Sequence, residues 1–286
     1  MNWLLLAFIS ALLSACAAVT QKKILFRIDA LSFSFFLSAV IMVLSFGALF
    51  LVNVTAVSGI TLIILVLKGV INAFAFVLVM MMLERADISG TLPLLALTPG
   101  VTAILAFVAI GETISSIEFW GLLLMIGGVL LLERRPTRLG SFKAQRYIWT
   151  ALLLFAISAV MDKVLVSGYR TSPITVLFYQ HAIFLSVYSI LILRKRIPLR
   201  RFMTREQLPM LALIGVVALF TLGYRLTQLD AMKTGDVAMV LAVKRTSVFF
   251  ASLVGGKMFS EKHLAIRLVG AAVIIAAGFI ILRNVA

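Results

Sequence analysis

Apolar residues run along the chain in long stretches that break at charges, proline or glycine. A helix that crosses a hydrocarbon core about 30 Å thick needs about 20 apolar residues, and the stretches have that length. A transmembrane β-barrel would instead alternate apolar and polar residues. The sequence therefore predicts an all-α membrane protein with ten transmembrane helices. The expected spans are Trp3 to Thr20, Ala30 to Val52, Gly59 to Leu83, Ile88 to Ile110, Ile117 to Leu132, Tyr147 to Val166, Pro173 to Leu193, Pro209 to Leu229, Val237 to Gly256 and Leu264 to Leu282.

Composition supports a membrane protein. Of 286 residues, 63% are hydrophobic and 13% are charged, and the mean hydropathy is +1.15. A soluble domain is nearer half apolar and a quarter charged. The single cysteine, Cys16, excludes an intramolecular disulfide. The bilayer is therefore the expected partner of most of the surface.

The net charge of +15 raises the question of a nucleic-acid partner. However, the basic residues lie mostly in short loops between apolar runs, a distribution that sets membrane orientation. Seventeen lie in the loops after odd-numbered spans, and four lie in the even-numbered loops and the tail. We therefore expect no nucleic-acid partner, a multi-pass protein of a cell membrane, and both termini on the non-cytoplasmic side.

The chain contains an internal repeat. An offset of 149 residues aligns Asp87 with Asp236 and Glu112 with Glu261, and an offset of 141 aligns residues 18–22 with 159–163. Each half is expected to hold five helices. Because five is odd, the second half enters the membrane inverted, an arrangement typical of transporters that alternate access around a central site. The predicted units are residues 1–134, a cytoplasmic linker at 135–146, and residues 147–286.

Several short sequences within the repeat resemble a known family. They are Gly90-Thr91-Leu92-Pro93, Thr98-Pro99-Gly100, Ile110-Gly111-Glu112, Trp120-Gly121 and Gly127-Gly128, with Ser260-Glu261, Val269-Gly270 and Gly278 in the second half. They are similar to the EamA repeat of the drug/metabolite transporter superfamily. The resemblance implies a ten-helix transporter. The second half departs from it in having Val248 where the first half has Pro99. Glu112 and Glu261, just past helix ends, are each expected to cap the N-terminus of the next helix along the chain.

Four basic residues fall well inside predicted spans: Lys68, Arg225, Lys244 and Arg245. A mid-membrane Lys or Arg costs roughly 2.5 to 3.5 kcal/mol on insertion scales, so each needs a wet cavity or a partner. No acid is expected at comparable depth, because Asp87, Asp162, Asp230 and Asp236 lie near span ends. The expected balance of buried charge is therefore strongly positive, which an anionic ligand would neutralise.

Helical spacing adds polar neighbours to these charges. Asn72 follows Lys68 by one turn, Tyr224 lies beside Arg225, and Gln180 and His181 lie within the seventh span. The candidate substrate-binding residues are Lys244, Arg245, Lys68, Asn72, Tyr224, Arg225 and His181. Other roles remain open for some of them: snorkelling for Arg225, an interhelical hydrogen bond for His181 and an interior ion pair for Lys68.

The sequence Val243-Lys244-Arg245-Thr246-Ser247-Val248 resembles the ninth helix of the plastid triose-phosphate translocators in the same superfamily. That resemblance implies that Lys244 and Arg245 hold a phosphate group. A guanidinium fork beside an ammonium also suits a carboxylate.

The sequence lacks the patterns of an enzyme. It has no metal-ligand cluster, no Cys/His or Ser/His pair that periodicity brings together, and no glycine-rich phosphate loop. We expect no cofactor and no metal. The sequence favours a secondary transporter, an exporter or exchanger, of a small anionic metabolite. The alternatives are a flippase of an anionic lipid and an exporter of amino acids or aromatic metabolites.

Overall fold

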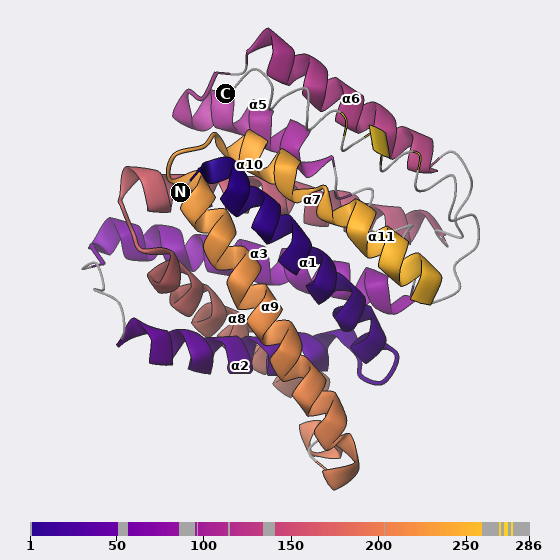
Figure 1. Cartoon of the computed structure of the whole chain (residues 1–286). Helices are drawn as coiled ribbons and strands as arrows, with labels where there is room; N and C mark the ends of the chain where they lie inside the picture. Colours follow the sequence, from indigo (N-terminus) through magenta and orange to yellow (C-terminus); the bar gives the residue numbers. More distant parts are fainter. Residues whose placement is uncertain are drawn as a thin grey trace.

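The protein folds as a bundle of helices (Figure 1). The computed structural model describes residues 2–50, 57–85, 97–113, 115–133, 141–202 and 204–258, with Leu95, Val269, Ala272, Val273 and Ala276. The described residues contain no β-strand. The helices of the first half are α1 (Trp3–Leu25), α2 (Ala30–Leu49), α3 (Gly59–Arg85), α5 (Thr98–Ile110) and α6 (Ser116–Glu133). Those of the second are α7 (Ser141–Lys163), the π-helix η1 (Val164–Gly168), α8 (Pro173–Lys195), the short η2 (Leu199–Phe202) and η3 (Arg205–Gln207), α9 (Leu208–Met232), α10 (Val237–Lys244) and α11 (Ser247–Met258).

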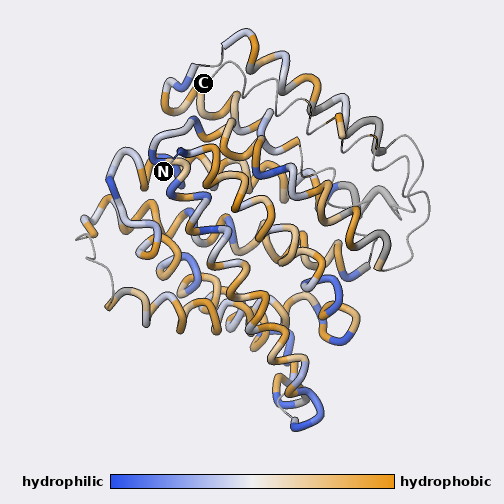
Figure 2. The backbone as a smooth tube through the Cα atoms, viewed as in Figure 1, coloured by the Kyte–Doolittle hydropathy of each residue, from blue (hydrophilic) through white to orange (hydrophobic). Residues whose placement is uncertain are grey.

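Six helices in the described residues are long and apolar enough to cross a membrane. They are Trp3–Leu25, Ala30–Ala48, Gly59–Glu84, Arg146–Gly168, Pro173–Lys195 and Arg205–Met232. Figure 2 shows hydrophobic residues along most of the bundle, with hydrophilic residues at the turn between α1 and α2 and before α9. This distribution is that of a protein whose outer surface faces lipid.

Local signals set several helix starts. Asp29 and Ser172 cap α2 and α8 by accepting hydrogen bonds from Ser32 and Thr175 backbone N–H groups. The helix α1 continues past the predicted span end at Thr20 to Leu25, and in this last part the Lys22 ammonium donates to the Leu83 carbonyl. A basic residue predicted to lie in a loop is thus buried at the end of a helix.

Two predicted spans are interrupted. The ninth, expected to run unbroken from Val237 to Gly256, is divided at Arg245 and Thr246 into α10 and α11, so that expectation of one continuous helix is wrong. In the fourth, Leu97 is a turn residue between the helical Leu95 and the start of α5 at Thr98, and residues 88–94 and 96 lie outside the described part. Almost all of the tenth, including Glu261, also lies outside it.

Helices of the two halves are interleaved. The closest pairs are α1 with α9, α3 with α7, and α2 with α8, while α5 packs on α7 and α11 on α1 (Figure 1). The repeat makes α1, α2, α3 and α5 the counterparts of α7, α8, α9 and α11. Exchanging each helix for its counterpart leaves this set of pairs unchanged. Lys22 and Lys163, which the repeat aligns, make matching bonds to the carbonyls of Leu83 and Gly235.

Loops expected on the non-cytoplasmic side meet at one end of the bundle. Glu112 accepts a hydrogen bond from the Val237 N–H at 3.0 Å and lies 3.4 Å from the Lys163 ammonium. Trp3 packs so closely on Gly235 that a Cβ there would come within 2.8 Å of the indole ring. Glu112 therefore caps a helix, as expected, but that helix is α10 in the other half, so the expectation that it caps the next helix along the chain is wrong.

Candidate functional site

A cavity of about 150 Å³ lies inside the bundle, between helices of both halves. Its wall is formed by α1, α2, α3, α7, α8, α9 and α10, together with Leu95, Thr98 and Arg245. Six of the residues expected to bind substrate line it: Asn72, His181, Tyr224, Arg225, Lys244 and Arg245. The seventh, Lys68, lies behind the wall. The other lining residues include twelve apolar side chains and eight polar ones, which are Ser14, Gln21, Thr98, Ser158, Asp162, Gln180, Thr221 and Gln228.

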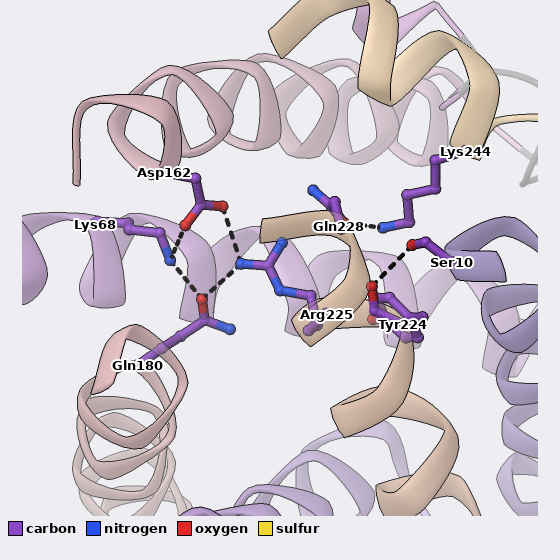
Figure 3. A network of polar contacts seen from close by, with 8 residues as sticks. All are labelled: Ser10, Lys68, Asp162, Gln180, Tyr224, Arg225, Gln228 and Lys244. Atoms are coloured by element: carbon purple, nitrogen blue, oxygen red, sulfur yellow. Dashed lines mark hydrogen bonds and ion pairs between the residues drawn. The ribbon is translucent and has the colours of Figure 1, made fainter. Parts of the chain in front are cut away.

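Four polar side chains at one side of the cavity form a network, and they are Lys68, Asp162, Gln180 and Arg225 (Figure 3). The Asp162 carboxylate lies 3.0 Å from the Lys68 ammonium and 2.9 Å from the Arg225 guanidinium. The Gln180 carbonyl oxygen accepts from both cations. Lys68 is 0% exposed, Asp162 1% and Arg225 8%. The network joins α3 of the first half to α7, α8 and α9 of the second.

Asp162 corrects an expectation drawn from the sequence. Its position near the end of the sixth predicted span suggested that no acid accompanies the buried cations. However, the last turns of α7 are packed between α3 and α9, and the apolar helix continues through η1 to Gly168. Asp162 is therefore enclosed by protein. The interior ion pair considered for Lys68 is confirmed, and Arg225 is paired inside the bundle and does not snorkel.

Lys244 and Arg245 occupy a different wall of the cavity. The Lys244 ammonium donates to the Gln228 side-chain oxygen at 2.6 Å and lies 4.4 Å from the centre of the Tyr224 ring. Arg245 donates to the Thr98 hydroxyl at 2.8 Å, and its Nε has no partner. Within the described part of the chain, neither side chain has a carboxylate within ion-pair distance. This pair of cations is thus held by neutral groups.

The cation pair lies where the two interrupted helices meet. Lys244 is the last residue of α10 and Arg245 follows it, while Thr98, which Arg245 contacts, is the first residue of α5. The helix α11 begins two residues later, at Ser247. Helix N-termini stabilise negative charge. The N-terminus of α5, a lysine and an arginine therefore adjoin one part of the cavity, and this arrangement can hold an anion.

Comparison with known proteins assigns the family. A sequence model of the EamA-like transporter family matches residues 1–134 and again residues 144–283. The chain belongs to the EamA-like transporter family. Members of this family are membrane transporters of small molecules and not enzymes. The protein is therefore a multi-pass membrane transporter, and the resemblance seen in the sequence is confirmed.

The fold of this EamA-like transporter is shared with a known structure. A crystal structure of another protein superposes with a TM-score of 0.73 at 13% sequence identity, covering 97% of this chain and 95% of the other. At that identity the likeness shows the fold alone. No curated protein matches the sequence.

Asn72 and His181, which were also predicted to bind substrate, line the cavity of this EamA-like transporter and carry polar atoms that have no hydrogen-bond partner in the part of the chain that the structure describes. Neither ring nitrogen of His181, nor the Asn72 side-chain oxygen, has a hydrogen-bond partner among the described residues. The expected interhelical hydrogen bond of His181 is therefore not formed. Buried polar groups are normally paired with protein or water, so these side chains offer hydrogen bonds to water or a ligand.

Sequence reasoning missed Asp162 and Thr98 as members of the site of this EamA-like transporter. Asp162 follows Ser158 by one helical turn, and both line the cavity. That spacing was a signal for a polar face on α7. Thr98 carried no such signal because its partner, Arg245, is 147 residues away in the sequence.

Proposed function

We propose that the protein is a secondary transporter of a small anionic metabolite, working as an exporter or exchanger by alternating access. The observation that carries this proposal is the cation pair of Lys244 and Arg245, which faces the cavity and, within the described part of the chain, has neutral partners only. A buried charge without a counter-charge is costly. An anionic group of the substrate would supply the missing charge.

The whole set of buried charges supports the same conclusion after the correction for Asp162. Four cations, Lys68, Arg225, Lys244 and Arg245, and one carboxylate lie in or beside the cavity in the described residues. The surplus remains positive. Asn72, His181 and Tyr224 would then contact the uncharged part of the substrate.

We further propose that the two halves are inverted five-helix units, giving ten spans in all. Two observations support this proposal. The set of packed helix pairs stays the same when each helix is exchanged for its counterpart in the other half, and Lys22 and Lys163 make matching contacts. The cavity lining reaches Gln21 and Leu83, near one end of the bundle, while Glu112 and Lys163 link the halves at the other. In this proposal the present state is open toward the cytoplasm.

A thermal-shift screen of the purified protein tests the proposal. Phosphorylated and carboxylated metabolites are compared with amino acids, aromatic compounds and anionic lipids. We expect a water-soluble anion to raise the unfolding temperature. In Lys244→Gln this response should be lost while the ligand-free unfolding temperature stays unchanged, because the substitution removes an uncompensated buried charge.

A second variant tests the geometry of anion binding. Arg245→Lys keeps the charge and loses the planar fork, so affinity for the anion should fall about tenfold or more. A response only to lipids, or only to neutral amino acids or aromatic compounds, would contradict the proposal. So would a Lys244→Gln protein that unfolds more easily yet keeps its ligand response.

A further inference from the structure

The network around Asp162 contains two cations, Lys68 and Arg225, and one carboxylate. The single carboxylate is shared between Lys68 at 3.0 Å and Arg225 at 2.9 Å. The fourth member, Gln180, contributes only a neutral oxygen to both cations. In a buried site, a cation without its own anion is strongly disfavoured. The network is therefore stable enough to form but would gain from a second negative group.

The two cations differ in their access to the cavity. Arg225 lines the cavity, whereas Lys68 does not. The Nε of Arg225 has no hydrogen-bond partner among the residues that the structure describes, while its Nη2 contacts both Asp162 and Gln180. A carboxylate or phosphate binds the arginine fork most strongly through two parallel hydrogen bonds. Asp162 does not use the fork in this way, so an anion in the cavity can make the better contact.

We propose that Asp162 pairs with Arg225 only while the transporter is empty. When an anionic substrate binds, it replaces Asp162 as the partner of Arg225. The inference rests on the proposed function, because it requires that the substrate be anionic. After displacement, Lys68 and Asp162 form a neutral pair, and Arg225 pairs with the substrate. Each cation of the network then has its own anion, and no proton transfer is needed.

Displacement also changes which helices are connected. The bond between Arg225 and Asp162 ties α9 to α7, whereas that between Lys68 and Asp162 ties α3 to α7. Substrate binding therefore releases α9 from α7, with α9 still joined to α8 through Gln180, while the link between α3 and α7 remains. The released helix also carries Gln228, which holds Lys244. Substrate binding at the cation pair and release of α9 are thus connected through one helix.

The test measures affinity for two probe anions, inorganic phosphate and succinate, in purified protein at constant ionic strength against chloride. Asp162→Asn should bind the probe roughly tenfold or more tightly than wild type, because Arg225 no longer has a competing carboxylate. Lys68→Met should weaken binding, because Asp162 then pairs with Arg225 alone. Asp230→Asn is the matched control: it removes an exposed carboxylate of α9 that pairs with Lys233, and affinity should stay within about twofold of wild type.

The double variant Lys68→Met with Asp162→Asn separates displacement from a general effect of charge. It leaves the net charge unchanged and avoids an unpaired buried Lys68, so it should fold even if Asp162→Asn alone does not. We expect it to bind the probe more tightly than wild type. Affinity equal to or below that of wild type would overturn the inference and leave the proposed anionic substrate intact. Absence of binding by wild type and by every variant would overturn the proposed function as well.

Discussion

At the residue scale, the site is a set of buried charges whose partners decide their roles. The positions of Arg225, Lys244 and Arg245 inside apolar spans were sufficient to predict that these side chains face the cavity. A lone charge within the membrane needs either water or a partner. It was not sufficient for Asp162. Distance from the end of a span gives depth along one helix, whereas enclosure depends on which helices pack beside it. That information resides in contacts between distant parts of the chain.

Glu112 gives a prediction on pH dependence. Burial raises the pKa of its carboxyl above the ordinary value of 4.5, against the opposing effects of the Val237 N–H and the Lys163 ammonium. The folded protein thus binds this proton more readily than the unfolded chain does. The stability that the Glu112 carboxyl contributes is therefore fully present below about pH 4.5 and is lost as the pH rises through the raised pKa.

Glu112→Gln should remove that contribution, so the unfolding temperature should fall less with rising pH than it does in wild type. The comparison is made between about pH 4 and pH 7. Glu206→Gln, in the exposed η3 segment, is the control and should follow wild type. An unchanged pH profile in Glu112→Gln would show that this carboxyl does not titrate differently in the two states.

At the scale of elements, the interrupted helices are the feature that the apolar pattern could not reveal. The break after α10 contains neither proline nor glycine, so the run from Val237 to Gly256 is typical of one continuous helix. The Thr246 hydroxyl donates to the Val243 carbonyl at 2.8 Å, a local bond that competes with helix geometry. Thr98 makes the equivalent bond to Leu95 at the start of α5.

Thr98→Val tests the contact between the two breaks. Valine keeps the shape but removes the hydroxyl that accepts the Arg245 hydrogen bond. A hydrogen bond to a charged group contributes about 1.5 to 3 kcal/mol, so the variant should unfold at lower temperature and bind anions less tightly. Thr102→Val is the matched control, because the buried hydroxyl of Thr102 has no partner, and its stability should be unchanged or slightly raised. Equal behaviour of the two variants would contradict a role for this contact.

At the scale of the whole molecule, the internal repeat predicted two related halves, because the same residues align in both. The interleaving of the halves was not predictable. A five-helix unit with an apolar surface can pack on its own copy in several ways, and periodicity does not distinguish them. The structure pairs α1 with α9 and α3 with α7. As a result, residues from both halves line one cavity.

The predicted orientation has a direct test with a reporter that is active only in the cytoplasm. Fused at the C-terminus it should be silent, because the charge distribution places that end on the other side of the membrane. Fused within the loop between Arg196 and Arg205, it should be active. Activity at the C-terminus with silence in the loop would reverse the orientation and leave the fold unchanged.

The central claim is that cations in the cavity bind an anionic substrate. Exchange of an anion across the membrane of liposomes tests this claim most directly. Protein is reconstituted, the vesicles are loaded with the anion that gives the largest thermal shift, and uptake of the same labelled anion is measured. The account predicts saturable uptake in wild type and loss of uptake in the double variant Lys244→Gln with Arg245→Gln. Undiminished uptake by that variant would contradict it.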